Sequence, residues 1–125
     1  MCFVCGKDNP RGFRLSFKHP EKGRLISEVT FKKEHQGYKD IVHGGMIAML
    51  LDEMMVNLAW LEGTPAVTGE LTVRLKRAVK VGERVLLEGR IESGKGRLLF
   101  ARAEAKNARG ELLASAMATC VQIKS

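Results

Sequence analysis

The chain has 125 residues, of which 45% are apolar and only three are proline, so it can bury one core but is too short for two ordinary domains. Its 21 basic residues outnumber the 14 acidic ones, and the net charge of +7 favours an anionic partner such as nucleic acid, a membrane surface or a phosphorylated small molecule. We expect a single domain over residues 1–125, whose partner the charge alone does not identify.

Several features of the sequence favour the cytoplasm. The longest run without a polar side chain, Gly44 to Leu51, is far too short to cross a bilayer, and the first five residues lack the basic start of a signal peptide. Three cysteines are an odd and small number, which suits a reducing compartment better than a disulfide scaffold. We therefore expect a cytoplasmic protein with no membrane contact and no structural disulfide.

The first twelve residues contain the motif Cys2-x-x-Cys5. A zinc or redox site would call for a second CxxC pair, or for a CxxC motif beside a β-α-β unit, and the sequence has neither. His19 and His35 could complete a tetrahedral site, but a packing or flexible role explains the two cysteines better. We expect no metal and no cofactor.

Strand patterns occur on both sides of one long apolar segment. Two strands are expected upstream of it, 13–18 and 24–31, joined by a turn at 20–23. Downstream, apolar residues alternate with charged ones, and glycine-containing turns at 81–83, 93–96 and 107–110 divide the runs. The downstream strands are expected to begin near Ala66 and to include Leu71, Val73, Leu75, Val85, Leu87, Ile91, 98–106 and 111–123.

The long apolar segment, Gly44 to Leu61, has apolar residues on every side of a helix. A helix of this kind is buried, and with about six strands available the economical architecture is a curved antiparallel sheet wrapped around it. Gly63 and Pro65 end the helix before the next strand. The sequence therefore predicts an α+β domain with one central helix.

Asp52, Glu53 and Asn57 are polar exceptions within this helix. A carboxylate in apolar surroundings is costly unless it is paired, protonated or used. Glu53 and Asn57 are most simply explained by a stripe that reaches solvent or a subunit contact. The helical neighbours of Asp52 are all apolar, which favours a functional carboxylate over a structural one that bonds a partner's backbone.

The helix starts at His43-Gly44-Gly45, where two glycines allow another group to approach the backbone closely. The first N–H groups of the helix and the positive end of its dipole would stabilise a carbonyl oxygen that acquires negative charge. A tight entry from strand to helix explains the two glycines equally well. This motif on its own is a weak signal.

The order and spacing of the motifs resemble one known family. His43-Gly44-Gly45 is preceded by His35-Gln36-Gly37-Tyr38 and followed by Asp52. Further matching segments are Thr68 to Arg74, Val81-Gly82-Glu83, Cys2 to Gly6, Asn9-Pro10 and Gly12. Together they resemble the PaaI-like acyl-CoA thioesterases of the hot-dog superfamily, over nearly the whole chain, and residues 1–12 resemble an N-terminal extension common in one branch of that group. The resemblance implies the hot-dog fold, a curved antiparallel sheet around one long central helix, and hydrolysis of acyl-CoA.

The resemblance also implies roles for individual residues. The backbone N–H of Gly45 would polarise the thioester carbonyl, and His43 would shape the same loop. Asp52 would act as a general base on water or as a nucleophile that forms an anhydride, and both routes stay open. Thr68 would help to hold the attacking water. Consistently, the sequence has no G-x-S-x-G motif for a serine nucleophile.

One position departs from the family's pattern, because many relatives carry an asparagine where this chain has Gly37. Gln36 supplies a neighbouring amide that could replace it. The departure leaves open a protein that binds or senses acyl-CoA without hydrolysing it. A dehydratase of the same fold is less favoured, since its proline-rich loop is absent.

Coenzyme A carries a pyrophosphate and a further phosphate, so an acyl-CoA substrate would account for the positive charge. The expected substrate-binding residues are Gly44, Arg74, Lys76, Arg77, Lys95 and Arg97. Solvated strand edges that discourage aggregation explain any single one of these basic residues equally well. Nucleic acid is not favoured as a partner, since there is no basic helix and no aromatic-rich RNA-binding strand.

Helix geometry predicts a site shared between two chains. Gly45 and Asp52 are seven residues apart on one helix, or roughly 10 Å along its axis. One carbonyl carbon cannot meet both groups if they belong to the same chain. A two-fold homodimer with antiparallel central helices would bring Gly45 of one subunit to Asp52 of the other. The resemblance implies the same homodimer and allows a dimer of dimers.

Overall fold

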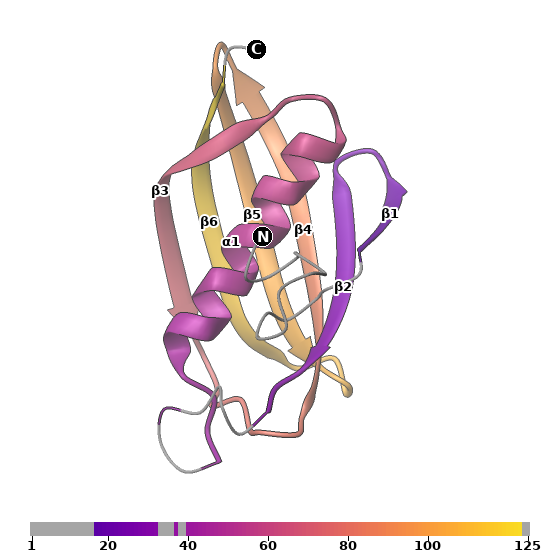
Figure 1. Cartoon of the computed structure of the whole chain (residues 1–125), viewed down its shortest axis with the longest axis vertical. Helices are drawn as coiled ribbons and strands as arrows, with labels where there is room; N and C mark the ends of the chain where they lie inside the picture. The colour runs from indigo at the N-terminus through magenta and orange to yellow at the C-terminus, as the bar shows by residue number, and fades with distance from the viewer. Residues whose placement is uncertain (1–16, 33–36, 38–39, 124–125) are drawn as a thin grey trace.

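The computed structural model describes residues 17–32, 37 and 40–123. Within these residues, six strands and one helix follow one another as β1 (Lys18–Glu21), β2 (Arg24–Thr30), α1 (Gly44–Leu61), β3 (Ala66–Leu75), β4 (Arg84–Lys95), β5 (Leu98–Asn107) and β6 (Leu112–Gln122). All strand pairs are antiparallel, in the order β1-β2-β4-β5-β6-β3, and the sheet curves around α1 (Figure 1). The expected α+β fold with one central helix is confirmed.

The first strand differs from its expected position. β1 continues through Pro20 to Glu21, so the predicted turn at 20–23 was wrong in its first half. β1 lies at the edge of the sheet, where a proline without an N–H need not break a ladder hydrogen bond. Residues 13–16 of the expected strand lie outside the described part of the chain.

The hairpin between β4 and β5 is also tighter than predicted. Its turn consists of Gly96 and Arg97 alone, whereas the glycine-rich sequence favoured a turn over residues 93–96. Gly96 has φ of 60°, a conformation that glycine adopts at the first position of some two-residue hairpin turns. The register shift between Ile91 and Ser93 shows that β4 absorbs the flexible sequence as a bulge instead of ending there.

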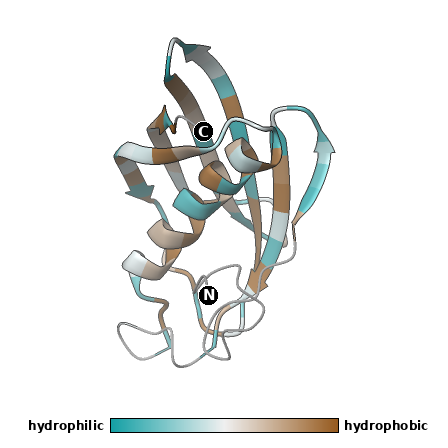
Figure 2. Cartoon of the chain, turned by 45° about the horizontal axis from the view of Figure 1, so that its top comes forward, coloured by the Kyte–Doolittle hydropathy of each residue, from teal (hydrophilic) through white to brown (hydrophobic). Residues whose placement is uncertain are grey.

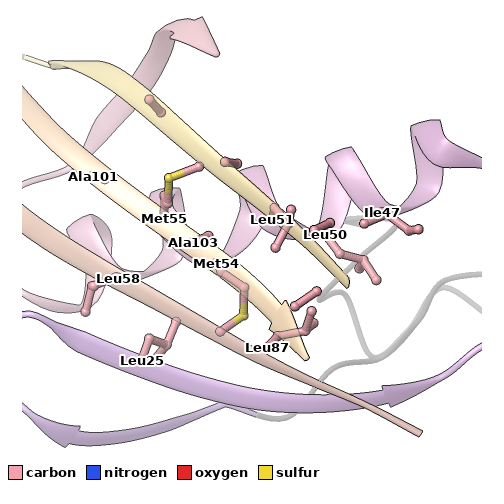
Figure 3. Close-up of a cluster of buried hydrophobic side chains, with 14 of the residues drawn as sticks. Leu25, Ile47, Leu50, Leu51, Met54, Met55, Leu58, Leu87, Ala101 and Ala103 are labelled. Carbon is pink, nitrogen blue, oxygen red and sulfur yellow. The ribbon is translucent and has the colours of Figure 1, made fainter. Parts of the chain in front are cut away.

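The core forms where α1 lies against the concave face of the sheet. The helix buries Ile47, Leu50, Leu51, Met54, Met55, Leu58 and Ala59. β5 and β6 meet these residues largely with alanines, so the helix and the sheet approach closely (Figure 3). A Cβ on Gly89 of β4 would lie 3.0 Å from the carbonyl oxygen of Met54, so only glycine at this position lets the helix backbone lie so close to β4.

The composition of α1 would also suit a membrane span by length and hydropathy. Most of its apolar residues, however, belong to the core or pack against it, and hydrophilic positions lie on the side turned away from the sheet (Figure 2). Trp60 and Leu61 at its end are exposed. Burial in the core therefore explains most of the apolar sequence of the helix.

One face of each downstream strand was expected to be buried, and this expectation fails for β3. Leu71 and Leu75 are 38% and 55% exposed, because β3 forms an edge of the sheet and pairs only with β6 among the described strands. Val67, earlier on the same strand, is 52% exposed. The described chain thus leaves an apolar edge without cover, a feature that favours association.

Glu62, the residue after α1, ties the helix to the β1–β2 hairpin. Its carboxylate accepts a hydrogen bond from the backbone N–H of Gly23 and lies 2.8 Å from the His19 ring nitrogen. Burial raises the pKa of Glu62, but the Gly23 N–H and His19 outweigh burial, so the pKa lies below its ordinary value.

We expect Glu62→Gln to lower the free energy of unfolding near neutral pH by roughly 1 kcal/mol. A carboxyl whose pKa is lower in the folded state contributes stability that is present above its unfolded pKa and is lost as the pH falls through the folded value. The difference from wild type should therefore shrink below the ordinary carboxyl pKa of about 4.3. Urea unfolding at a series of pH values measures it. A difference that stays constant with pH would show that Glu62 acts through packing alone.

Candidate active site

The predicted carboxylate and the predicted hydroxyl meet in the structure. Asp52 is half-buried near the middle of α1, and Thr68 lies near the start of β3. The Thr68 hydroxyl donates a hydrogen bond to Asp52 Oδ1 over 2.5 Å. This contact places Asp52 on the side of the helix that faces β3, and it leaves the second carboxylate oxygen, Oδ2, for other partners.

Glu53 and Asn57, the other polar residues of α1, are hydrogen-bonded to each other. The side-chain amide of Asn57 donates to Glu53 Oε2 and to the Glu53 backbone carbonyl, both over 2.8 Å. This supports a structural explanation for Glu53 and Asn57, as expected from their spacing.

His43 caps the start of α1, which its sequence position alone did not reveal, because the usual capping residues are Ser, Thr, Asp and Asn. Its backbone is extended, with φ of −61° and ψ of 131°, and its Nδ1 accepts the N–H of Gly45 over 2.9 Å. A neutral ring that accepts at Nδ1 carries its proton on Nε2. The Gly45 N–H is therefore already bonded, and a substrate carbonyl would reach it only after the His43 ring turns aside.

A pocket of about 380 Å³ opens at this end of the helix. Its lining includes His43 and Gly44 together with two of the predicted phosphate-binding residues, Lys76 and Arg77. Arg77 also pairs with Glu111 over 2.8 Å. The pocket therefore joins the candidate oxyanion loop to positive charge.

Arg74 lies elsewhere, on the outer face of the sheet. It lines a depression of about 500 Å³ there with Glu70, Thr72 and Lys76, so Lys76 borders both this depression and the pocket at the start of α1. A bulge at Gly69, between the pairs formed by Thr68 and Glu70, resets the alternation of β3. Arg74 consequently points away from the face that holds α1 and Thr68.

Lys95 and Arg97 are also far from this pocket within one chain. The Arg97 carbonyl accepts from Gln122, whose neighbour Ile123 bonds to Pro65 just after α1. The β4–β5 hairpin therefore lies at the end of the molecule where α1 ends, and the pocket lies where α1 begins (Figure 1).

The position that departs from the family's pattern abuts the cap. A Cβ on Gly37 would lie 3.4 Å from Cα and from Cδ2 of His43, an ordinary contact distance. Gln36, the predicted substitute amide, and both cysteines of the Cys2-x-x-Cys5 motif lie outside the described residues. Within the described ranges, no group of three His, Cys, Asp or Glu side chains could hold a metal.

The sequence model of the thioesterase superfamily matches residues 39–114, which are more than half of the chain. The chain belongs to the thioesterase superfamily. Among characterised relatives, acyl-coenzyme A thioesterase 13 of Mus musculus is 29% identical over 98 residues, which cover 76% of this chain and 69% of that protein. The Homo sapiens protein of the same name is 27% identical over 95 residues, covering 74% and 68%.

Solved structures agree with this family. A crystal structure of a thioesterase superfamily protein aligns with a TM-score of 0.89 and 26% identity over 94% of this chain, which spans only 61% of that protein. Escherichia coli PaaI aligns with a TM-score of 0.82 at 15% identity, over 87% of this chain and 83% of that one. A Streptococcus mutans protein bound to acetyl CoA aligns with a TM-score of 0.83 at 22% identity, over 89% of this chain and 90% of that one. The assignment to hot-dog thioesterases, a class of thioester hydrolases, is confirmed.

Proposed function

We propose that the protein hydrolyses acyl-CoA thioesters to a free acid and CoA. The observation that carries the proposal is the Asp52–Thr68 pair, because Thr68 holds a carboxylate that projects from a largely apolar helix in a member of the thioesterase superfamily. A thioester has a weakly stabilised carbonyl and a good leaving group, so one carboxylate and one oxyanion donor suffice. The relatives named acyl-coenzyme A thioesterase and the neighbour bound to acetyl CoA support acyl-CoA as the substrate.

The carboxylate acts through its second oxygen. Thr68 holds Oδ1, so Oδ2 of Asp52 is the atom that accepts a proton from the attacking water or attacks the carbonyl carbon itself. The N–H of Gly45 and the positive end of α1 stabilise the oxygen that becomes negative, once the His43 ring has moved. Both chemical routes use the same two groups.

We infer that each site is shared by two chains. Gly45 and Asp52 lie on one continuous helix, about 10 Å apart along its axis. The apolar edge of β3, with Val67, Leu71 and Leu75 exposed, offers the surface through which two copies would meet. Antiparallel pairing of two β3 edges would extend the sheet and set these side chains against those of the partner's β3 and the elements beside it.

Two further properties stay predictions. The exposed Phe100 and Met117 on the outer face of the sheet offer a surface on which two dimers could stack into a tetramer. Cytoplasmic location is expected from the cysteine content.

Two observations favour acyl-CoA binding without hydrolysis: the Gly45 N–H is bonded to His43, and Gly37 replaces the family's asparagine. Release of CoA thiol across a panel of short, long and aromatic acyl-CoAs decides between the two functions. Hydrolysis of at least one member supports the proposal. Calorimetric binding across the panel with no thiol release would establish the sensing function instead.

We expect Lys76→Glu to raise KM for acyl-CoA about threefold to tenfold and to leave kcat nearly unchanged, because phosphates are held equally in the ground and transition states. The effect should fade as ionic strength rises. Lys95→Glu is the matched control, since it reverses the same charge at the β4–β5 hairpin, which within one chain lies at the end of the molecule away from the pocket at the start of α1. An equal rise in KM for Lys95→Glu would place the phosphates at the β4–β5 hairpin.

A further inference from the structure

A cysteine lies next to the Asp52–Thr68 pair and has no part in the mechanism so far. Cys120 of β6 is the residue directly opposite Thr68 in the β3–β6 ladder. Directly opposed residues point to the same face of a sheet, with their Cβ atoms about 5 Å apart. The Cys120 side chain therefore lies on the same face of the sheet as the Thr68 side chain, the face toward the helix. It is buried, with 1% of the residue exposed.

We propose that Cys120 is a positioning residue of the active site, whose thiol donates a hydrogen bond to Thr68 Oγ1 and so keeps the Thr68 hydroxyl proton directed at Asp52. Its catalytic meaning rests on the proposed thioester hydrolysis. The three side chains then form a chain of donors that ends on the carboxylate, from Cys120 through Thr68 to Asp52.

The direction of this chain follows from counting protons. A threonine hydroxyl has one proton to donate and two lone pairs to accept with. Thr68 donates its hydroxyl proton to Asp52 Oδ1, so it can only accept a hydrogen bond from Cys120. A thiol can supply that bond, whereas a thiolate would compete for the Thr68 proton and place a second negative charge beside the carboxylate.

The surroundings keep Cys120 in the thiol form. Burial raises the pKa of Cys120, and the charge of Asp52 raises it further, against the lowering effect of Thr68. The sulfur therefore carries its proton at neutral pH and is a poor nucleophile there. This also explains why Cys120 can lie beside the reactive carboxylate of Asp52 without acting as the nucleophile itself.

The expected kinetic effect is on turnover. Without the thiol, the Thr68 hydroxyl can turn to other acceptors, and Asp52 loses the contact that fixes Oδ1. The buried sulfur does not reach substrate, so KM should stay nearly constant. We expect Cys120→Ala and Cys120→Val to lower kcat about fivefold to tenfold, the value of one neutral hydrogen bond in the transition state.

Four variants separate this role from packing. Cys120→Ser keeps a donor and is expected to restore most of the kcat that alanine and valine lose. Leu99→Val removes apolar volume directly opposite Cys120 on β5 without touching a donor, and it should lower stability while leaving kcat unchanged. In a Thr68→Val background, Cys120→Val should cost no further activity, because the two residues act as one unit.

An infrared measurement tests the contact without reference to activity. In a chain with Cys2→Ser and Cys5→Ser, Cys120 is the only thiol, and its S–H stretching band reports hydrogen bonding. We expect the band to move to higher frequency in Thr68→Val. An unmoved band overturns the proposal, as do equal losses of kcat in the serine and alanine variants or additive losses in the double variant. If the wild type releases no CoA thiol, the proposed function fails, and the infrared band still decides whether Cys120 donates to Thr68.

Discussion

Replacing Asp52 with asparagine is expected to lower kcat for thioester hydrolysis by about a thousandfold, within the range of a lost general base or nucleophile. The amide oxygen can still accept the Thr68 hydroxyl, so the local geometry survives. The amide can neither take up a proton from water nor attack the carbonyl. Thiol-release kinetics measure the loss, and calorimetry with acyl-CoA should show that binding survives.

The matched control for this variant is Glu53→Gln, which removes the neighbouring charge on the same helix. Glu53 is bonded to Asn57 and lies outside the Asp52–Thr68 pair, so its kcat should stay near wild type. Folding of both variants is checked by circular dichroism, and we expect their stabilities to lie within about 1 kcal/mol of wild type. Near wild-type turnover by Asp52→Asn would make Asp52 structural and remove the basis of the proposed mechanism.

The sequence predicted those elements whose bounds depend on their own residues and not on the strands that pair with them. The helix 44–61 was placed at its observed bounds, because a run that is apolar all round is bounded by two glycines at its start and by Gly63 and Pro65 after its end. The extended β1 and the short hairpin at Gly96 were missed, because edge position and bulges decide where these strands end.

The candidate site was predicted in part. The order of motifs gave Asp52 and Thr68, and the structure shows that these two residues touch. The cap by His43 and the position of Cys120 were not predicted, because the first depends on a side-chain rotamer and the second on the register of β3 against β6. Arg74 was expected at the same site as Lys76, but Lys76 lines both the pocket at the start of α1 and the outer depression, whereas Arg74 lines only the depression. Sequence spacing does not show which face of a sheet a residue occupies after a bulge.

The shared site predicts that two inactive chains restore activity in each other. We expect Asp52→Asn and Gly45→Pro to be inactive alone, the second because proline lacks the N–H that would polarise the carbonyl. Proline is tolerated in the first turn of a helix, and the atoms nearest a side chain at this position belong to the His43 ring, which can move. After the two variants are unfolded and refolded together, thiol release should recover to about a quarter of wild type.

The value of a quarter follows from the two-fold symmetry of the proposed dimer. Random association makes about half of the dimers mixed, and each mixed dimer contains one site with an intact Gly45 from one chain and an intact Asp52 from the other. Its second site carries both substitutions, so it contributes nothing. A site built within one chain would give no recovery, because each chain lacks one of the two groups. The mixture must contain mixed dimers, which native mass spectrometry establishes, and circular dichroism must show that Gly45→Pro folds. Mixed dimers that are folded and inactive would rule out Gly45 and Asp52 as partners across the interface, and the acyl-CoA carbonyl would then have to find its oxyanion donor on the same chain as Asp52.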